Sequence, residues 1–128
     1  MNIRVWLSIA TFALCLGTTL SAHHSWTADY DGGKPVTVKG VVSKVEWTNP
    51  HTHFYVDVKD ASGTVKTWNF EMASTLALER GGWTRKTLPV GTEVTIAGFG
   101  GRSVTERAIA SSITTADGKS LFVGKPGQ

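Results

Sequence analysis

The fold follows from residues 36–47, Val-Thr-Val-Lys-Gly-Val-Val-Ser-Lys-Val-Glu-Trp, the longest β-strand candidate in the chain. Before Gly40 the apolar residues fall on even positions, whereas Val41, Val45 and Trp47 fall on odd positions. Successive side chains of a strand point to opposite faces, so the apolar face changes at Gly40. A glycine inside a strand indicates a bulge or a sharp bend. We therefore predict one long first strand that bends at Gly40.

Shorter elements follow this strand. Alternating runs on both sides of the turn Asp60-Ala61-Ser62-Gly63 predict a β-hairpin. Ser74 is a residue type that caps helix N-termini, and Gly81-Gly82 would end such a helix. A turn cluster at residues 31–35 would delay the first strand, and a glycine-rich loop is expected at residues 98–102. The other expected elements are strands over residues 53–59, 64–71, 93–97 and 107–115 and one helix over residues 74–80.

Along the chain, the expected elements are three strands, then a helix, then two strands. This order is typical of an OB-fold. This all-β fold is a small five-stranded Greek-key barrel, in which the bent first strand pairs in both halves and one short helix lies between strands three and four. Residues 90–98, Val-Gly-Thr-Glu-Val-Thr-Ile-Ala-Gly, look like the fourth strand of many bacterial OB domains. An immunoglobulin-like sandwich is disfavoured because it needs about seven strands and no central helix.

The N-terminal residues have the composition of a Sec-type signal peptide. Arg4 precedes an apolar stretch from Val5 to Leu16, and small and polar residues lead to Ser21-Ala22. This apolar stretch is too short for a membrane span. We expect a periplasmic or secreted protein with a signal peptide over residues 1–22, an N-terminal arm over residues 23–35 and a barrel domain over residues 36–128.

Composition and charge exclude several classes of function. The formal net charge is only +3 and the basic residues are scattered, so neither nucleic-acid binding nor stable membrane insertion after cleavage is expected. No Gly-x-Ser-x-Gly motif is present, and the single cysteine, Cys15, lies in the signal peptide. Glu46 and Asp57 would act as acid and base only if folding brought them together. We expect a binding protein and no enzyme.

The four histidines form two pairs, His23-His24 and His51-x-His53. Cleavage after Ala22 makes His23 the N-terminal residue, so its amine and its ring Nδ1 can chelate one metal ion. Cleavage after Ser21 would remove that chelate. Imidazole suits copper and zinc, and Cu²⁺ binds most tightly among the common divalent ions. We therefore predict a copper site of His23 with His51 or His53, and with His24 as a substitute, which resembles the histidine brace of some secreted copper proteins on other folds.

Two rival hypotheses stay open. In an OB-fold the loops after strands one and four flank the binding face, and a small molecule or a glycan could stack there on Trp47. Such a tryptophan also suits the cap of a small barrel core. Alternatively, the same surface docks on a periplasmic partner protein. In both cases the histidines would have no metal-binding role, His23 and His24 lying in a frayed N-terminal arm and His51 in a turn. The candidate ligand-binding residues are Trp47, Asn49, Tyr55, Phe99 and Arg102.

Several motifs together resemble a widespread bacterial family of small exported proteins that is known only as a domain of unknown function. They are His23-His24-Ser25-Trp26, Lys34-Pro35-Val36, Lys39-Gly40-Val41-Val42, Glu46-Trp47-Thr48-Asn49-Pro50-His51, Tyr55-Val56-Asp57-Val58 and an Arg80-to-Arg85 stretch with one extra glycine. The resemblance implies export, a small β-barrel and a role for His23, His24 and His51. His53 departs from the family motif.

Overall fold

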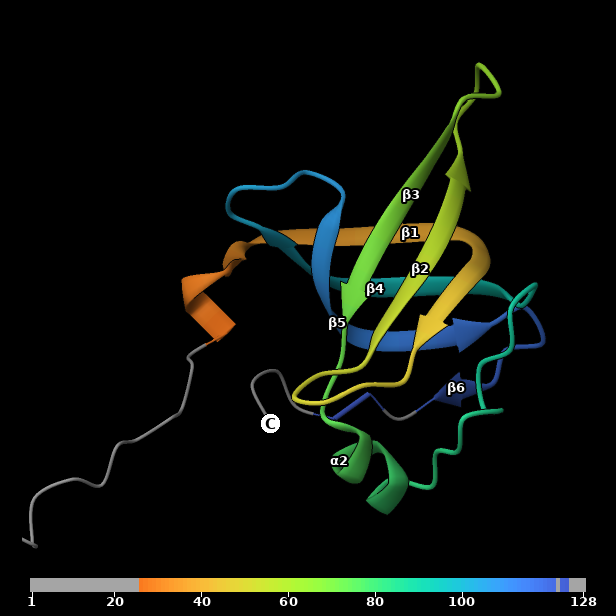
Figure 1. Cartoon of the computed structure of the whole chain (residues 1–128). Helices are drawn as coiled ribbons and strands as arrows, with labels where there is room; N and C mark the ends of the chain where they lie inside the picture. Colours follow the sequence, from red (N-terminus) through yellow and green to blue (C-terminus); the bar gives the residue numbers. More distant parts are fainter. Residues whose placement is uncertain (1–25, 122, 125–128) are drawn as a thin grey trace, which may run out of the picture.

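The computed structural model describes residues 26–121 and 123–124 (Figure 1). The predicted signal peptide and the ligand candidates His23 and His24 lie outside the described residues. Within the described part, no helix has the length and the apolar character that a membrane span requires. The elements are the 3₁₀-helix η1 (Trp26–Ala28), the strands β1 (Tyr30–Glu46), β2 (His53–Lys59) and β3 (Val65–Glu71), the helix α2 (Thr75–Arg80), and the strands β4 (Glu93–Gly101), β5 (Arg107–Thr115) and β6 (Ser120–Leu121).

The strands form one sheet that closes on itself. Their order is β3-β2-β1-β4-β5-β6, and a parallel pairing of β3 with β5 closes the barrel. The first part of β1 pairs with β4 and its last part pairs with β2, so β1 bends around the barrel (Figure 1). This pairing defines an OB-like Greek-key barrel with a short helix between β3 and β4, and the predicted fold class is confirmed. The structure adds β6, a two-residue strand that pairs with β5.

Gly40 lies where β1 passes from β4 to β2. A Cβ atom at this position would come within 2.3 Å of the carbonyl oxygen of Asp57 in β2. Only glycine therefore lets the two strands approach this closely. The bulge lies further along the strand, between Val42 and Lys44, so the bend and the bulge are separate features.

β1 begins at Tyr30, earlier than expected. Residues 31–35 were predicted to form a turn outside the strand, and this prediction is wrong because both sides of the stretch are paired with β4. Tyr30 pairs with Gly101 and Pro35 pairs with Phe99, with a register shift between the two pairs. The turn-forming residues are thus accommodated as an irregularity inside the strand.

β4 continues to Gly101, so most of the glycine-rich loop expected at residues 98–102 is strand. A Cβ atom on Gly98 would lie 2.1 Å from the carbonyl oxygen of Ile109 in β5. The register between β4 and β5 also shifts between Ala97 and Gly98. The glycine therefore serves the close packing of two strands at a bulge.

The core fills the barrel from the inward faces of the strands. Phe54 and Phe70 are buried and stack with their ring centroids 5.6 Å apart. Trp47 and Trp68 are partly buried and pack against this core, which agrees with the barrel-cap interpretation of Trp47. The predicted N-cap of α2 is confirmed, because the Ser74 hydroxyl accepts a hydrogen bond from the backbone N–H of Ala77.

Gly98→Ala tests the close approach of β4 and β5. The added methyl group would meet the backbone of Ile109 and Ala110 in β5, which cannot withdraw without breaking the pairing of the two strands. We expect the free energy of unfolding to fall by about 3 kcal/mol, the upper end of the cost of overpacking. Urea denaturation followed by circular dichroism measures this loss. Gly33→Ala is the matched control, because its Cβ would meet only the exposed carboxylate of Asp31, at 3.3 Å. Equal losses in the two variants would contradict the packing role of Gly98.

Candidate functional site

A polar pocket of about 350 Å³ lies where the start of β1, the β1–β2 loop, the end of β3 and the start of β5 meet. His51, His53, Glu71 and Arg107 line it. The remaining lining residues are Asp29, Thr48, Asn49 and Pro50. The pocket thus contains the predicted histidine pair of the barrel and one of the five predicted ligand-binding residues, Asn49.

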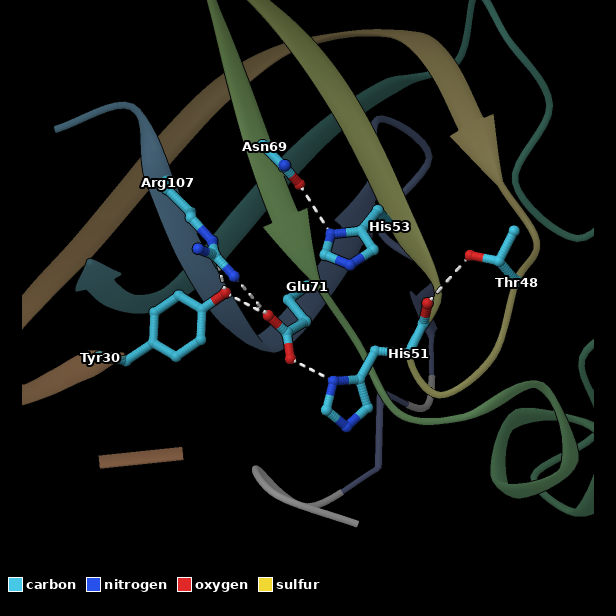
Figure 2. A network of polar contacts seen from close by, with 7 residues as sticks. All are labelled: Tyr30, Thr48, His51, His53, Asn69, Glu71 and Arg107. Atoms are coloured by element: carbon cyan, nitrogen blue, oxygen red, sulfur yellow. Dashed lines mark hydrogen bonds and ion pairs between the residues drawn. The ribbon is translucent and has the colours of Figure 1, made fainter. Parts of the chain in front are cut away.

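Glu71 is the centre of a hydrogen-bond network in this pocket (Figure 2). Its side chain is buried, and its Oε2 accepts hydrogen bonds from the Tyr30 hydroxyl and, at 3.1 Å, from Arg107 Nη2. Its Oε1 lies 2.5 Å from Nδ1 of His51. A buried carboxylate is stable only when it is paired and hydrogen-bonded, and Glu71 has partners from β1, β5 and the β1–β2 loop.

The parallel pairing of β3 with β5 brings the members of this network together. Asn69 of β3 is in register with Arg107 of β5, which places the guanidinium beside Glu71 two residues along β3. Arg107 Nε also donates to the Tyr30 hydroxyl at 3.0 Å. Burial and the neighbouring Glu71 carboxylate raise the pKa of Tyr30, so the phenol keeps its proton and donates a hydrogen bond to Glu71.

Both barrel histidines have Nδ1 occupied by an oxygen acceptor. Nδ1 of His53 lies 3.0 Å from Oδ1 of Asn69, and this amide oxygen can only accept, so Nδ1 carries the hydrogen. Nδ1 of His51 faces the Glu71 carboxylate in the same way. Neither ring has a hydrogen bond at Nε2 within the described residues. In their neutral forms both imidazoles therefore keep a free lone pair on Nε2.

The β1–β2 loop is hydrogen-bonded to the first residue of α2 and to the segment between β3 and α2. Oδ1 of Asn49 accepts hydrogen bonds from the backbone N–H and the hydroxyl of Thr75, at 3.2 and 3.0 Å. Thr52 exchanges backbone hydrogen bonds with Met72 and Ala73. The loop contains a cis peptide bond between Asn49 and Pro50. The contacts at both ends of the loop thus place His51 beside Glu71.

Phe99 and Arg102, two of the predicted ligand-binding residues, contact the N-terminal arm. The Phe99 ring packs on Trp26 with a centroid distance of 5.5 Å. Arg102 donates from its backbone N–H to Asp29 and from Nε to the carbonyl of Thr27, both at 2.9 Å. These contacts bring Asp29 to the rim of the pocket.

The other predicted residues lie apart from the pocket or have partners of their own. Tyr55 donates to Glu46 at 3.1 Å, and the Lys44 ammonium lies 5.1 Å from the Tyr55 ring centroid. Asp57 accepts from Ser43 and Thr67, so Glu46 and Asp57 bind different partners. Trp47 packs against the core.

The described part of the chain does not contain a complete metal site. Over residues 26–121 and 123–124, no three histidine, cysteine, aspartate or glutamate side chains come together in a group that could hold a metal ion. His51 and His53, two of the four predicted ligands, line the same pocket. The other predicted ligands, His23 and His24, lie outside the described residues.

Three residues that line the pocket, Asp29, Glu71 and Arg107, escaped the sequence analysis. So did Tyr30, which donates a hydrogen bond to Glu71. Successive side chains of a strand alternate between its two faces. Glu71 therefore lies on the same face of β3 as Asn69, the outer face, and opposite to the buried Phe70. This alternation was the one sequence pattern that could have indicated that Glu71 lies outside the core. Its partners Tyr30 and Arg107 are 41 and 36 residues away, and no local pattern links residues at such separations.

Fold and pocket together define a small OB-like barrel with a polar pocket at its rim. The chain belongs to a family of unknown function, DUF6152, whose model matches residues 12–110. No curated protein is detectably similar to the chain. Among solved structures, the chain is similar to the N-terminal domain of PriB from Thermoanaerobacter tencongensis, described as a dimer. The identity is 23%, the TM-score is 0.46, and the match covers 66% of this chain and 97% of that chain.

Glu71→Ala tests the central role of this carboxylate. The substitution leaves the Tyr30 hydroxyl buried and the Arg107 guanidinium without its counter-ion. We expect the free energy of unfolding to fall by about 2 kcal/mol, below the loss from a fully buried pair, because 36% of the Arg107 side chain is exposed. Thermal and urea denaturation measure this change.

Glu106→Ala is the control for this variant. It removes an exposed carboxylate 3.4 Å from Lys66, and such a contact contributes little. If Glu71→Ala were as stable as Glu106→Ala, the network would not stabilise the barrel.

Proposed function

We propose that the chain is an exported protein that binds one copper ion. His51 and His53 are the ligands from the barrel, and the mature N-terminal His23 completes the site through its amine and its ring. The observation that carries this proposal is the free Nε2 of both barrel histidines at one pocket. His24 is the substitute for a barrel histidine.

The hydrogen bonds at Nδ1 are those that metal-binding histidines make. Such a histidine almost always donates its other ring N–H to a carboxylate, a carbonyl or water, which fixes the tautomer and orients the ring. Glu71 has this relation to His51, and the Asn69 amide oxygen has it to His53. The same hydrogen bonds are not required by a histidine that only fills a surface turn.

The attachment of the arm supports a ligand from the N-terminus. Asp29 lines the pocket, and contacts with Phe99 and Arg102 hold the arm from Trp26 onward. His23 precedes Trp26 by three residues, and three residues of extended chain span at most about 11 Å. An amine at residue 23 is therefore tethered to an arm that already reaches the rim.

The donor set favours copper. An amine and imidazole nitrogens bind first-row divalent ions in an order that peaks at Cu²⁺. Two imidazoles alone form a weak site, so the N-terminal chelate distinguishes this proposal from an ordinary surface histidine pair. Signal cleavage after Ala22 is part of the proposal, since it creates the amine.

His51→Ala should weaken Cu²⁺ binding by at least about tenfold, because it removes one ligand without opening the core. Calorimetric titration with Cu²⁺ in the presence of glycine as a competitor measures the affinity, and circular dichroism checks the fold. Lys86→Ala is the control, since Lys86 lines a separate pocket. An unchanged affinity in a folded His51→Ala protein would remove His51 from the site.

One alanine inserted before His23 should weaken Cu²⁺ binding by roughly tenfold, because it moves the amine away from the imidazole of His23. Native mass spectrometry of the exported protein reports the cleavage site and the bound copper together. The control carries the same alanine after Gln128. A mature N-terminus other than His23, or an equal affinity in both extended proteins, would contradict the N-terminal chelate.

A further inference from the structure

A second surface lies at the end of the barrel that α2 occupies, away from the tip of the β2–β3 hairpin (Figure 1). Leu76 and Arg80 are four residues apart on α2, so they share one face of this helix. That face is opposite to Leu78, which is buried in the core. Leu76 is 53% exposed. The outward face of α2 therefore presents an aliphatic side chain next to a guanidinium group.

A tight turn after α2 presents two more cations. Arg85 and Lys86 are its central residues, and the backbone N–H of Thr87 closes it by donating to the carbonyl of Thr84 at 3.1 Å. Both threonine hydroxyls add to this closure. They accept hydrogen bonds from the backbone N–H groups of Thr84 and Lys86, at 2.8 and 3.2 Å. The turn thus has a defined shape with both basic side chains at its corner.

The position of this turn is fixed by the core on both sides. Trp83 and Leu88, which flank the turn, are only 6% and 2% exposed. Glu79 of α2 lines the same pocket of about 550 Å³ as Arg85 and Lys86, so the turn lies beside the helix. We call the surface formed by Leu76, Arg80, Arg85 and Lys86 the α2-end surface.

The cations of the α2-end surface lack counter-ions. Arg80, Arg85 and Lys86 are exposed, and over residues 26–121 and 123–124 their side chains form no ion pair and no hydrogen bond. Glu79 is also exposed and unpaired in this part of the chain, so three positive charges and one negative charge leave a net charge of +2. Four other cations, in contrast, lie beside carboxylates: Lys44, Lys66, Arg102 and Arg107.

We propose that the α2-end surface docks on anionic phospholipid bilayers. The negative potential of such a bilayer attracts basic side chains, and each one near the surface raises the affinity roughly fivefold. An exposed leucine beside the cations suits the boundary between headgroups and acyl chains, where peripheral proteins bury apolar side chains. The contact is a reversible adsorption that leaves the barrel outside the hydrocarbon layer.

The same charges would also attract nucleic acid, but the apolar part of the surface favours lipid. Proteins that bind single strands stack the bases on exposed aromatic rings. The aromatic residue next to these cations is Trp83, which is only 6% exposed. The exposed apolar residue is Leu76, which offers no ring to a base and can enter the headgroup region of a bilayer.

Flotation of the mature protein with lipid vesicles tests the proposal. Phosphatidylcholine vesicles with about a third of phosphatidylglycerol should bind it roughly 25-fold more tightly than pure phosphatidylcholine vesicles, because two net charges contribute roughly fivefold each. Salt at about 0.5 M should remove most of this difference, because it shortens the Debye length to about 4 Å. Equal binding to both kinds of vesicle would overturn the proposal. Binding of a single-stranded oligonucleotide as tight as that of the anionic vesicles would do so too.

A double variant, Arg85→Gln with Lys86→Gln, should lower the affinity for the anionic vesicles by roughly 25-fold, because it removes two cations from the contact. The matched control is Lys39→Gln with Lys59→Gln, which changes the net charge of the protein equally. Both control residues are exposed strand residues without an ion pair in the described part of the chain. Equal losses in the two double variants would assign the binding to the net charge of the protein and overturn the proposal.

Glu79→Gln provides a gain of binding, which a misfolded variant does not give. It removes the negative charge of the surface, so the affinity for anionic vesicles should rise roughly fivefold. Leu76→Ser should lower the affinity for both kinds of vesicle by roughly fivefold, because it removes a half-exposed apolar side chain from the contact. Circular dichroism checks the fold of each variant. Unchanged binding in both folded variants would contradict this orientation of the protein on the bilayer.

The α2-end surface shares no residue with the polar pocket, so this proposal does not rest on the copper site. Flotation in the presence of EDTA keeps metal ions out of the measurement. Failure of copper binding leaves the vesicle results as they are, and failure of vesicle binding leaves the copper titrations as they are.

Discussion

The buried carboxylate of Glu71 is the constraint on which the barrel rim depends. A carboxylate in this environment requires strong donors, and each of its three donors comes from a different segment of the chain. Tyr30 begins β1, Arg107 begins β5, and His51 lies in the β1–β2 loop. The same group therefore stabilises the closure of the barrel between β3 and β5 and orients a histidine toward the pocket. Structure and proposed function depend on one interaction.

The two barrel histidines differ in how they are held. His51 donates to a charged carboxylate and His53 lies against a neutral amide. Charge-assisted hydrogen bonds are the stronger kind, so the ring of His51 is the more firmly oriented of the two. His53 depends on the register of β2 with β3, which places it beside Glu71 and near Asn69.

The glycines show where local patterns mislead. Glycine and proline at residues 31–35 and glycines at residues 98–101 are typical turn and loop residues. In the barrel both stretches pair with each other as parts of β1 and β4. The pairing of Tyr30 with Gly101 and the close approach of Gly98 to β5 outweigh the local preference. As a result β1 begins earlier than expected, and Phe99 and Arg102 contact the residues that precede it.

The sequence by itself determined the strand order, the bend at Gly40, the capped helix and the histidine pair beside the Asn-Pro turn. These features depend on alternation, on glycine and on capping residues, which act over a few neighbouring positions. Only the tertiary structure decided which ring nitrogen of each histidine is free and which residues share their pocket. The partners of Glu71 come from residues 36 and 41 positions away, and the closure of β3 on β5 is what brings such distant donors to one carboxylate.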